Sequence, residues 1–96
     1  MYVVIFKAKI SKLDDAYAKV AQRLRDTALS EFGCIEFHTV TENDHEIALS
    51  YWPDEEKILL WKQHSDHVIA QELGRERWYE SYSVQVCEIQ REYHRP

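Results

Sequence analysis

The chain has 96 residues, of which 45% are hydrophobic and 30% charged, with a formal net charge of −5 at pH 7. This length allows one domain with one core, and the composition is typical of a folded globular protein. Lysines and arginines alternate with acids, as in Arg75-Glu76-Arg77, whereas nucleic-acid-binding proteins concentrate positive charge on one face. We therefore expect a single domain over residues 1–96 without a nucleic-acid partner.

The first segment, residues 2–10, alternates as a β-strand requires. One face carries Tyr2, Val4, Phe6, Ala8 and Ile10, and the other carries Val3, Ile5, Lys7 and Lys9. The two lysines end the apolar run too early for a signal peptide or a membrane span, so we expect a cytoplasmic protein without a membrane partner. In that reducing compartment, Cys34 and Cys87 are expected to be free and to lie on strands.

A helix follows the first strand. The segment Ser11-Lys12-Leu13-Asp14 fits a capping box, in which side-chain oxygens satisfy the free amides of a helix start. Gly33 supplies the left-handed residue that ends the helix. Between these points the apolar residues recur at spacings of three and four, which indicates an amphipathic helix: Leu13, Tyr17, Val20, Ala21, Leu24, Ala28 and Phe32.

The middle of the chain reads as a β-hairpin followed by more helix. Residues 34–41 and 46–52 are two β-rich runs joined by the polar residues 42–45. Pro53 and Asp54 start a second helical region, because proline is tolerated in a first turn. We expect this region to break near Ser65-Asp66, which can cap a further helix running to about Tyr79. Residues 82–92 alternate again and give the last strand.

The resulting order, β-α-β-β-α-β, is the split βαβ arrangement of ferredoxin-like α+β domains. Short, right-handed connections predict the strand order 4-1-3-2 in an antiparallel sheet with both helical layers on one face, and Cys34 and Cys87 on opposite edge strands. The first and third strands carry apolar groups on both faces, whereas a one-sided sheet alternates apolar with polar. We therefore expect a homodimer that packs sheet to sheet, with Trp52 and the first strand serving the contact.

Aromatic, imidazole and guanidinium groups gather in residues 51–79. Within this segment Ile58, Trp61, His64, Ser65 and Val68 form one stripe on a helix. Two interpretations of the stripe stay open. Trp61 and His64 either line a cavity, where histidine can exchange protons near neutral pH, or they are a core anchor and a boundary residue.

The histidine pair and the arginines of this segment also leave alternatives. His64 and His67 share a helix face but make only half of a metal site, and we expect no metal. Arg75 or Arg77 can hold an anionic or enolate oxygen by a forked hydrogen bond. The alternative for either arginine is an exposed ion pair with Glu72, Glu76 or Glu80.

The strand order, the strand end Ser50-Tyr51-Trp52, the turn Pro53-Asp54-Glu55-Glu56 and the helical run Trp61 to His67 together resemble the antibiotic biosynthesis monooxygenase family over essentially the whole chain. The resemblance implies a dimeric α+β barrel. It also implies an oxidoreductase of the kind that oxygenates small aromatic substrates, such as quinols, anthrones or polyketides, with molecular oxygen and without metal or flavin. Haem-degrading members carry a first-strand asparagine and a histidine about ten residues after the helical tryptophan. Here those positions hold lysines and Gln71, so haem degradation is not expected.

The resemblance also implies roles for particular side chains. We expect Trp61, His64 and Arg75 to be catalytic, with Arg77 as the alternative to Arg75. The expected substrate-binding residues are Tyr51, His67, Arg77 and Trp78. A non-catalytic dimeric domain, which binds a small molecule or is associated with stress, remains the alternative function, because the same aromatic pocket serves either. The sequence names neither the substrate nor the pathway.

Overall fold

The computed structural model of the chain describes residues 1–11, 15–73 and 78–96. Its elements are β1 (Tyr2–Ile10), α1 (Asp15–Glu31), β2 (Glu36–Glu42), β3 (His45–Trp52), α2 (Glu55–Leu73) and β4 (Tyr79–Glu88). The strands form one antiparallel sheet in the order β2-β3-β1-β4. The predicted fold class and strand order are confirmed.

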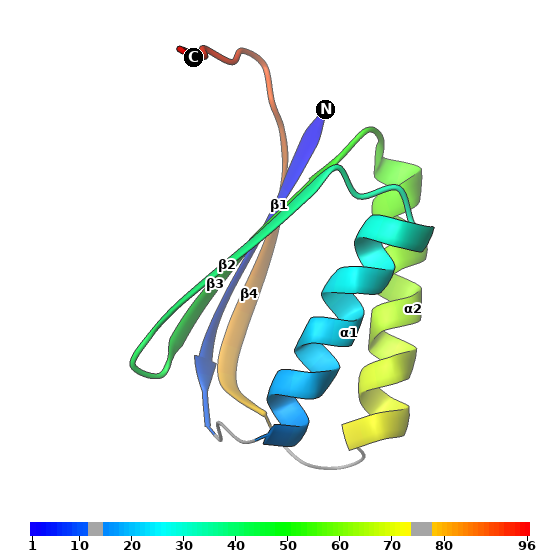
Figure 1. Cartoon of the computed structure of the whole chain (residues 1–96), viewed down its shortest axis with the longest axis vertical. Coiled ribbons are helices and arrows are strands. Elements are labelled where there is room, and N and C mark those ends of the chain that lie inside the picture. Colours follow the sequence, from blue (N-terminus) through cyan, green and yellow to red (C-terminus); the bar gives the residue numbers. More distant parts are fainter. Residues whose placement is uncertain (12–14, 74–77) are drawn as a thin grey trace.

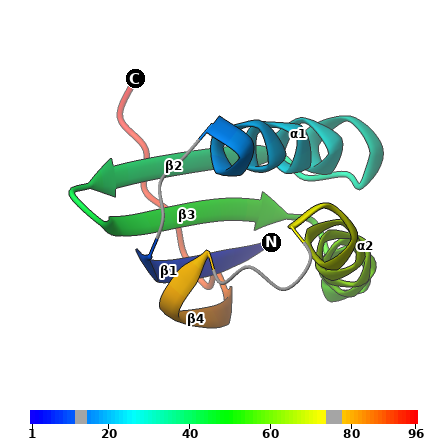
Figure 2. The same ribbon diagram turned by 90° about the horizontal axis from the view of Figure 1, so that it is seen from below.

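Both helices lie on one face of the sheet, as expected (Figure 1). We call this the helical face and the opposite side the outer face. α1 packs against β2 and against α2, and α2 packs against β3. Figure 2 shows α1 beside β2, with β4 at the far side of the sheet from α1. The helices therefore cover the β2 side of the helical face better than the β4 side.

Two core clusters hold the helices on the sheet. The first joins Ala28, Cys34, Trp52 and Ile58, with partly buried side chains such as Trp61 packed against it. The second joins Ile10, Tyr17 and Trp78. Because the first cluster packs on the beginning of β1 and the second on its end, they lie at opposite ends of the helical face. Apolar burial at these two points is the main stabilising contribution to the fold.

Local signals fix the connections. Gly33 has a φ of 80°, which confirms it as the left-handed residue after α1. Asn43 also has a positive φ, 57°, so the hairpin turn is shorter than expected and both strands run up to it. The Asp54 carboxylate accepts a hydrogen bond from the Lys57 amide at 2.9 Å, which caps the start of α2. The predicted capping box falls largely on residues 12–14, outside the described residues.

Several expected boundaries were wrong. α2 is one continuous helix, and the Ser65 hydroxyl donates to the Lys62 carbonyl at 3.1 Å within it instead of capping a new start. Tyr79 belongs to β4, which begins three residues before the predicted Tyr82 and ends at Glu88. Cys34 precedes β2 and is buried in the first cluster rather than lying on a strand.

The sequence suggested that Trp52 serves the dimer contact, and this prediction was wrong. Its side chain is fully buried on the helical face, and its Nε1–H donates to the Ser50 hydroxyl at 2.8 Å. Neither of the helices that the structure describes is long and apolar enough to cross a membrane. The outer face of β1 and β3 keeps its apolar side chains Val3, Ile5, Ile47, Leu49 and Tyr51, as the alternation predicted.

Candidate functional site

The predicted helical stripe lies where the sequence placed it. Ile58 is buried, and Trp61, His64 and Val68 are partly buried along α2. The Trp61 ring lies 6.2 Å from the Trp52 ring and 5.6 Å from the Phe32 ring, between centroids. These contacts make Trp61 a core anchor along part of its surface.

His64 lies beside Trp61 in the same cluster. Its ring centroid is 4.9 Å from that of Phe32 and 6.0 Å from that of Trp61. The imidazole therefore lies at the boundary between the two helices, half-buried against aromatic rings. The structure thus brings together two of the three residues expected to be catalytic.

The other predicted residues do not join them. Tyr51 lies on the outer face, with its ring 6.5 Å from that of His38, so it does not share a site with Trp61 within one subunit. His67 is exposed on α2. Trp78 is buried in the second core cluster, at the other end of the helical face. Arg75 and Arg77 lie outside the described residues.

A β-bulge in β4 changes the face to which one side chain points. Ala8 pairs with Tyr82 and Lys9 with Ser81, but Ile10 pairs with Tyr79, which leaves Glu80 as the extra residue. Tyr79 therefore lies on the helical face with Ile10. Without the bulge, strict alternation would put Tyr79 on the outer face. The exposed Glu80 carboxylate lies 3.3 Å from the Lys9 ammonium.

The bulge completes an aromatic and apolar surface that the helices leave uncovered. We call it the open β4 face and define it as Phe6, Tyr79, Tyr82, Val84 and Val86. The ring centroid of Phe6 lies 5.2 Å from that of Tyr79 and 5.9 Å from that of Tyr82. Tyr82 is 66% exposed, and Val84 and Val86 are each 47% exposed, although they point to the side on which the helices pack. Such a surface is suited to stacking against a flat apolar molecule.

A buried hydrogen-bonded group adjoins the open β4 face. The Tyr17 hydroxyl on α1 donates to the Glu46 carboxylate on β3, and the Tyr17 and Tyr79 hydroxyl oxygens lie 3.4 Å apart. Glu46 is only 8% exposed, and a buried carboxylate needs such a partner. The ring of Trp78 stacks on that of Tyr17 at 5.3 Å and shields it from water. The Trp78 Nε1–H finds no acceptor among the described residues.

Burial decides the protonation of the two tyrosines. It raises the pKa of the Tyr17 hydroxyl far above its usual range, and the hydrogen bond to Glu46 adds to that rise. Burial also raises the pKa of Tyr79, although its hydrogen bond with Tyr17 opposes that rise in part. Both side chains are therefore neutral hydroxyls at physiological pH.

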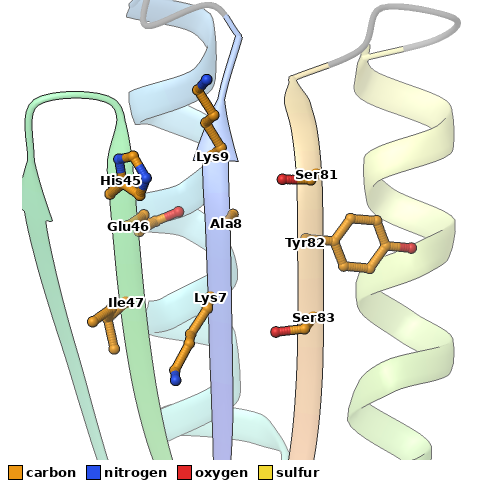
Figure 3. Close-up of a pocket in the computed structure, with 9 residues that line it drawn as sticks. All are labelled: Lys7, Ala8, Lys9, His45, Glu46, Ile47, Ser81, Tyr82 and Ser83. Atoms are coloured by element: carbon orange, nitrogen blue, oxygen red, sulfur yellow. The ribbon is translucent and has the colours of Figure 1, made fainter.

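A second feature lies on the opposite side of the sheet. Figure 3 looks onto the outer face, where a hollow of about 480 Å³ opens at the end of the sheet near the hairpin turn. Its lining residues come from the three strands β1, β3 and β4: Lys7, Ala8, Lys9, His45, Glu46, Ile47, Ser81, Tyr82 and Ser83. The sheet separates this hollow from Trp61 and His64.

The described residues offer neither a cluster of metal ligands nor an activated thiol. Within residues 1–11, 15–73 and 78–96, no three His, Cys, Asp or Glu side chains gather as metal ligands would. Cys34 and Cys87 are free. Burial raises the pKa of the Cys34 thiol, whose sulfur donates to the Glu36 carbonyl at 3.1 Å, so this thiol is a poor nucleophile.

The sequence reading missed the Tyr17, Glu46 and Tyr79 group. The sequence carried one signal for Glu46. By the alternation of a strand, Glu46 points to the same face as Trp52, whose side chain is buried on that face. A carboxylate on that side predicts a buried partner. No pattern identified Tyr79, because its orientation depends on the bulge.

Comparison with known proteins identifies relatives of the chain. No model of a protein family matches the chain. The chain is 37% identical to the uncharacterized protein YqjZ of Bacillus subtilis over 92 residues, which cover 95% of this chain and 81% of YqjZ. It is 29% identical to jasmonate monooxygenase ABM of Pyricularia oryzae over 93% of its own length, and it spans 43% of that longer protein.

Solved structures agree with this fold. A variant of SnoaB, a cofactor-independent oxygenase from Streptomyces nogalater, superposes with a TM-score of 0.75 at 7% identity, covering 95% of this chain and 94% of SnoaB. The fold is therefore that of the antibiotic biosynthesis monooxygenases, which is typically dimeric. The chain belongs to the same family as YqjZ and has the fold of the antibiotic biosynthesis monooxygenases.

Proposed function

We propose that the protein is a cofactor-independent monooxygenase that acts on a small aromatic substrate, such as a quinol, an anthrone or a polyketide. The observation that carries this proposal is the open β4 face, where aromatic and valine side chains remain exposed beside a buried hydroxyl and carboxylate group. Flat aromatic molecules bind to such surfaces, which are mostly apolar with a few polar groups that fix orientation.

One end of the open β4 face adjoins the first core cluster. Val86 of this face pairs with Val4, and Val4 and Trp61 both pack against that cluster. In the proposed reaction His64 accepts the acidic C–H proton, Trp61 closes the site, and Arg75 or Arg77 binds the anionic oxygen. The substrate anion then reacts with molecular oxygen. For an anthrone, one oxygen atom becomes the new carbonyl, and the second leaves as water with the two hydrogens of the CH2 group.

Tyr51, His67 and Trp78, which were expected to bind the substrate, lie in different parts of the molecule. Trp78 stacks on Tyr17 and supports the hydroxyl and carboxylate group from behind. Tyr51 lies on the outer face and His67 is exposed, so either would reach a substrate only through a partner subunit or a closing segment. We propose Trp78 as a supporting residue of this site.

We also propose that the protein is a homodimer that packs through its outer face. Ile47 is 45% exposed and Val40 is 68% exposed there, beside the partly buried Val3, Ile5 and Leu49. The flanking positions of β2 and β4 on this face are mostly polar, for example His38 and Gln85. An apolar centre with a polar rim is the usual anatomy of a protein interface.

Oxygen consumption tests the oxygenase directly. Purified protein is incubated with simple hydroquinones and with anthrone, and the rate is compared with buffer. We expect a rate above buffer, which His64→Ala lowers about a hundredfold, the usual contribution of a positioned acid or base. Trp61→Ala is expected to lower the rate as well.

The control is His94→Ala, which makes the same substitution at an exposed position of the C-terminal segment. It is expected to leave the rate unchanged. A rate no higher than that of buffer, or equal rates in the wild-type protein and both site variants, would favour the second candidate, a domain that binds a small molecule without transforming it. The open β4 face supports that candidate too, because binding requires the same surface.

A further inference from the structure

The Tyr79, Tyr17 and Glu46 side chains form a directional row that leads from the open β4 face into the protein. Tyr79 is part of that face, and its ring contacts Phe6 and Tyr82. Its hydroxyl oxygen lies 3.4 Å from that of Tyr17, which in turn donates to the buried Glu46 carboxylate. The row thus joins a surface suited to aromatic ligands with a base that is 8% exposed.

The acceptor at the inner end determines the direction of every hydrogen bond in the row. An ionised carboxylate only accepts, so the single Tyr17 proton points to Glu46. The Tyr17 oxygen can then only accept from Tyr79, whose own proton is used in that contact. The Tyr79 oxygen is left with lone pairs that a ligand on the open β4 face can meet. This arrangement favours a ligand that donates an O–H over one that offers a carbonyl or an ether.

We infer that Tyr79, Tyr17 and Glu46 are a proton-accepting relay that binds the acidic hydroxyl of an aromatic or enolic ligand on the open β4 face and takes its proton. The ligand O–H bond breaks and its proton passes to Tyr79, while the Tyr79 proton passes to Tyr17 and the Tyr17 proton to Glu46. The products are the ligand oxyanion and a neutral Glu46 carboxylic acid, with both tyrosines regenerated. No oxidant or other reactant takes part in this step.

The surroundings of the relay suit this role. Trp78 stacks on Tyr17, and Ile10 packs in the same cluster, so the inner hydroxyl is kept from water. A hydrogen bond to a charged acceptor is stronger in such a site than in water. The bulge at Glu80 gives Tyr79 its orientation, and Glu80 itself forms an ion pair with Lys9. The inference rests on the proposed function only in naming an acidic aromatic hydroxyl as the ligand.

A pair of probes that differ by one methyl group tests the hydrogen bond. 2-Naphthol carries a hydroxyl, and 2-methoxynaphthalene has the same rings without the proton. We expect wild-type protein to bind 2-naphthol about tenfold more tightly, which corresponds to the net contribution of one hydrogen bond. Tyr79→Phe is expected to remove that preference while it keeps the affinity for the ether. Tyr2→Phe makes the same substitution on β1 outside the relay and is expected to keep the preference.

Fluorescence of bound 2-naphthol tests the proton transfer itself. The excited molecule is a strong acid, and its naphtholate emits at longer wavelength than its neutral form. With nearly all of the probe bound, we expect naphtholate emission from the wild-type protein, and neutral naphthol emission from Glu46→Gln and Tyr79→Phe. Glu46→Gln keeps an acceptor for Tyr17 but cannot take the proton, and circular dichroism verifies that it is folded.

Three outcomes would overturn the inference: no binding of 2-naphthol, equal affinity for the two probes, or the same naphtholate fraction in the wild-type protein and both relay variants. These measurements use no oxygen and no turnover. A protein that shows the relay signature but consumes no oxygen would therefore contradict the proposed oxygenase and leave the relay intact. Oxygen consumption without the relay signature would do the reverse.

Discussion

Two buried polar side chains on one face of β3 show how single residues position the site. Trp52 and Glu46 both lie on the helical face, and each is satisfied by a neighbouring hydroxyl, Ser50 for the indole and Tyr17 for the carboxylate. Buried polar groups without such partners are costly. The pairing with Ser50 fixes Trp52 in the core, whereas the pairing with Glu46 holds Tyr17 beside Tyr79 and so builds the candidate relay.

The raised pKa of Tyr17 predicts a change in stability at alkaline pH. Because burial raises the pKa in the folded state above that of the unfolded chain, the native protein keeps a proton that the unfolded chain loses above pH about 10. The stability contributed by protonated Tyr17 is therefore fully present below that pH and is lost as the pH rises further. We expect urea unfolding to show a decline in stability above pH 10 that is shallower in Tyr17→Phe. Equal slopes in the two proteins would contradict the burial of this hydroxyl.

The sequence allowed part of the site to be predicted at this scale. The stripe of Ile58, Trp61 and His64 follows from helical periodicity alone, and the structure has it. The orientation of Tyr79 could not be predicted, because it depends on one extra residue in β4 and thus on the register with β1. The predicted arginines, Arg75 and Arg77, fall outside the described residues and stay predictions.

At the scale of elements, the strand order and the single helical layer followed from short connections and right-handed crossovers. The boundaries within residues 53–82 were less predictable. A serine followed by an aspartate is a common helix start, but in α2 the Ser65 hydroxyl donates to the Lys62 carbonyl and the Lys62 ammonium lies 2.7 Å from the Asp66 carboxylate. Both interactions belong to a continuous helix, and packing on β3 overrides the local preference.

The continuity of α2 can be tested with Ser65→Ala. Alanine is the better helix former by about 0.5 kcal/mol, and no cap is lost in a continuous helix. We expect the variant to be as stable as the wild-type protein or slightly more stable in urea unfolding. A loss of about 1 kcal/mol, the usual cost of removing an N-cap, would instead indicate a helix start at Ser65.

At the scale of the whole molecule, the two faces of the sheet serve different purposes. The helical face holds both core clusters and the open β4 face, whereas the outer face presents apolar side chains at its centre. The sequence predicted the double apolar character of β1 and β3, and with it the proposed dimer. It assigned Trp52 to the wrong face because both faces of β3 are apolar near that end.

The proposed dimer makes a prediction about mass. Ile5 and Leu49 pair with each other on the outer face, so Ile5→Lys puts a charge at the centre of the expected contact. We expect light scattering to give twice the mass of one chain for the wild-type protein and the mass of one chain for the variant. Leu29→Lys, which changes a partly exposed leucine on α1, serves as the control and is expected to stay dimeric. A wild-type monomer, or a dimeric Ile5→Lys, would contradict this contact.

Methyl NMR with 2-naphthol tests most directly the central claim that ligands bind on the open β4 face. Val84 and Val86 report on that face, and Ile47 and Val40 report on the outer face. We expect shift changes and intermolecular contacts from the probe to the methyl groups of Val84 and Val86. Contacts to Ile47 and Val40, with Val84 and Val86 unmoved, would contradict it.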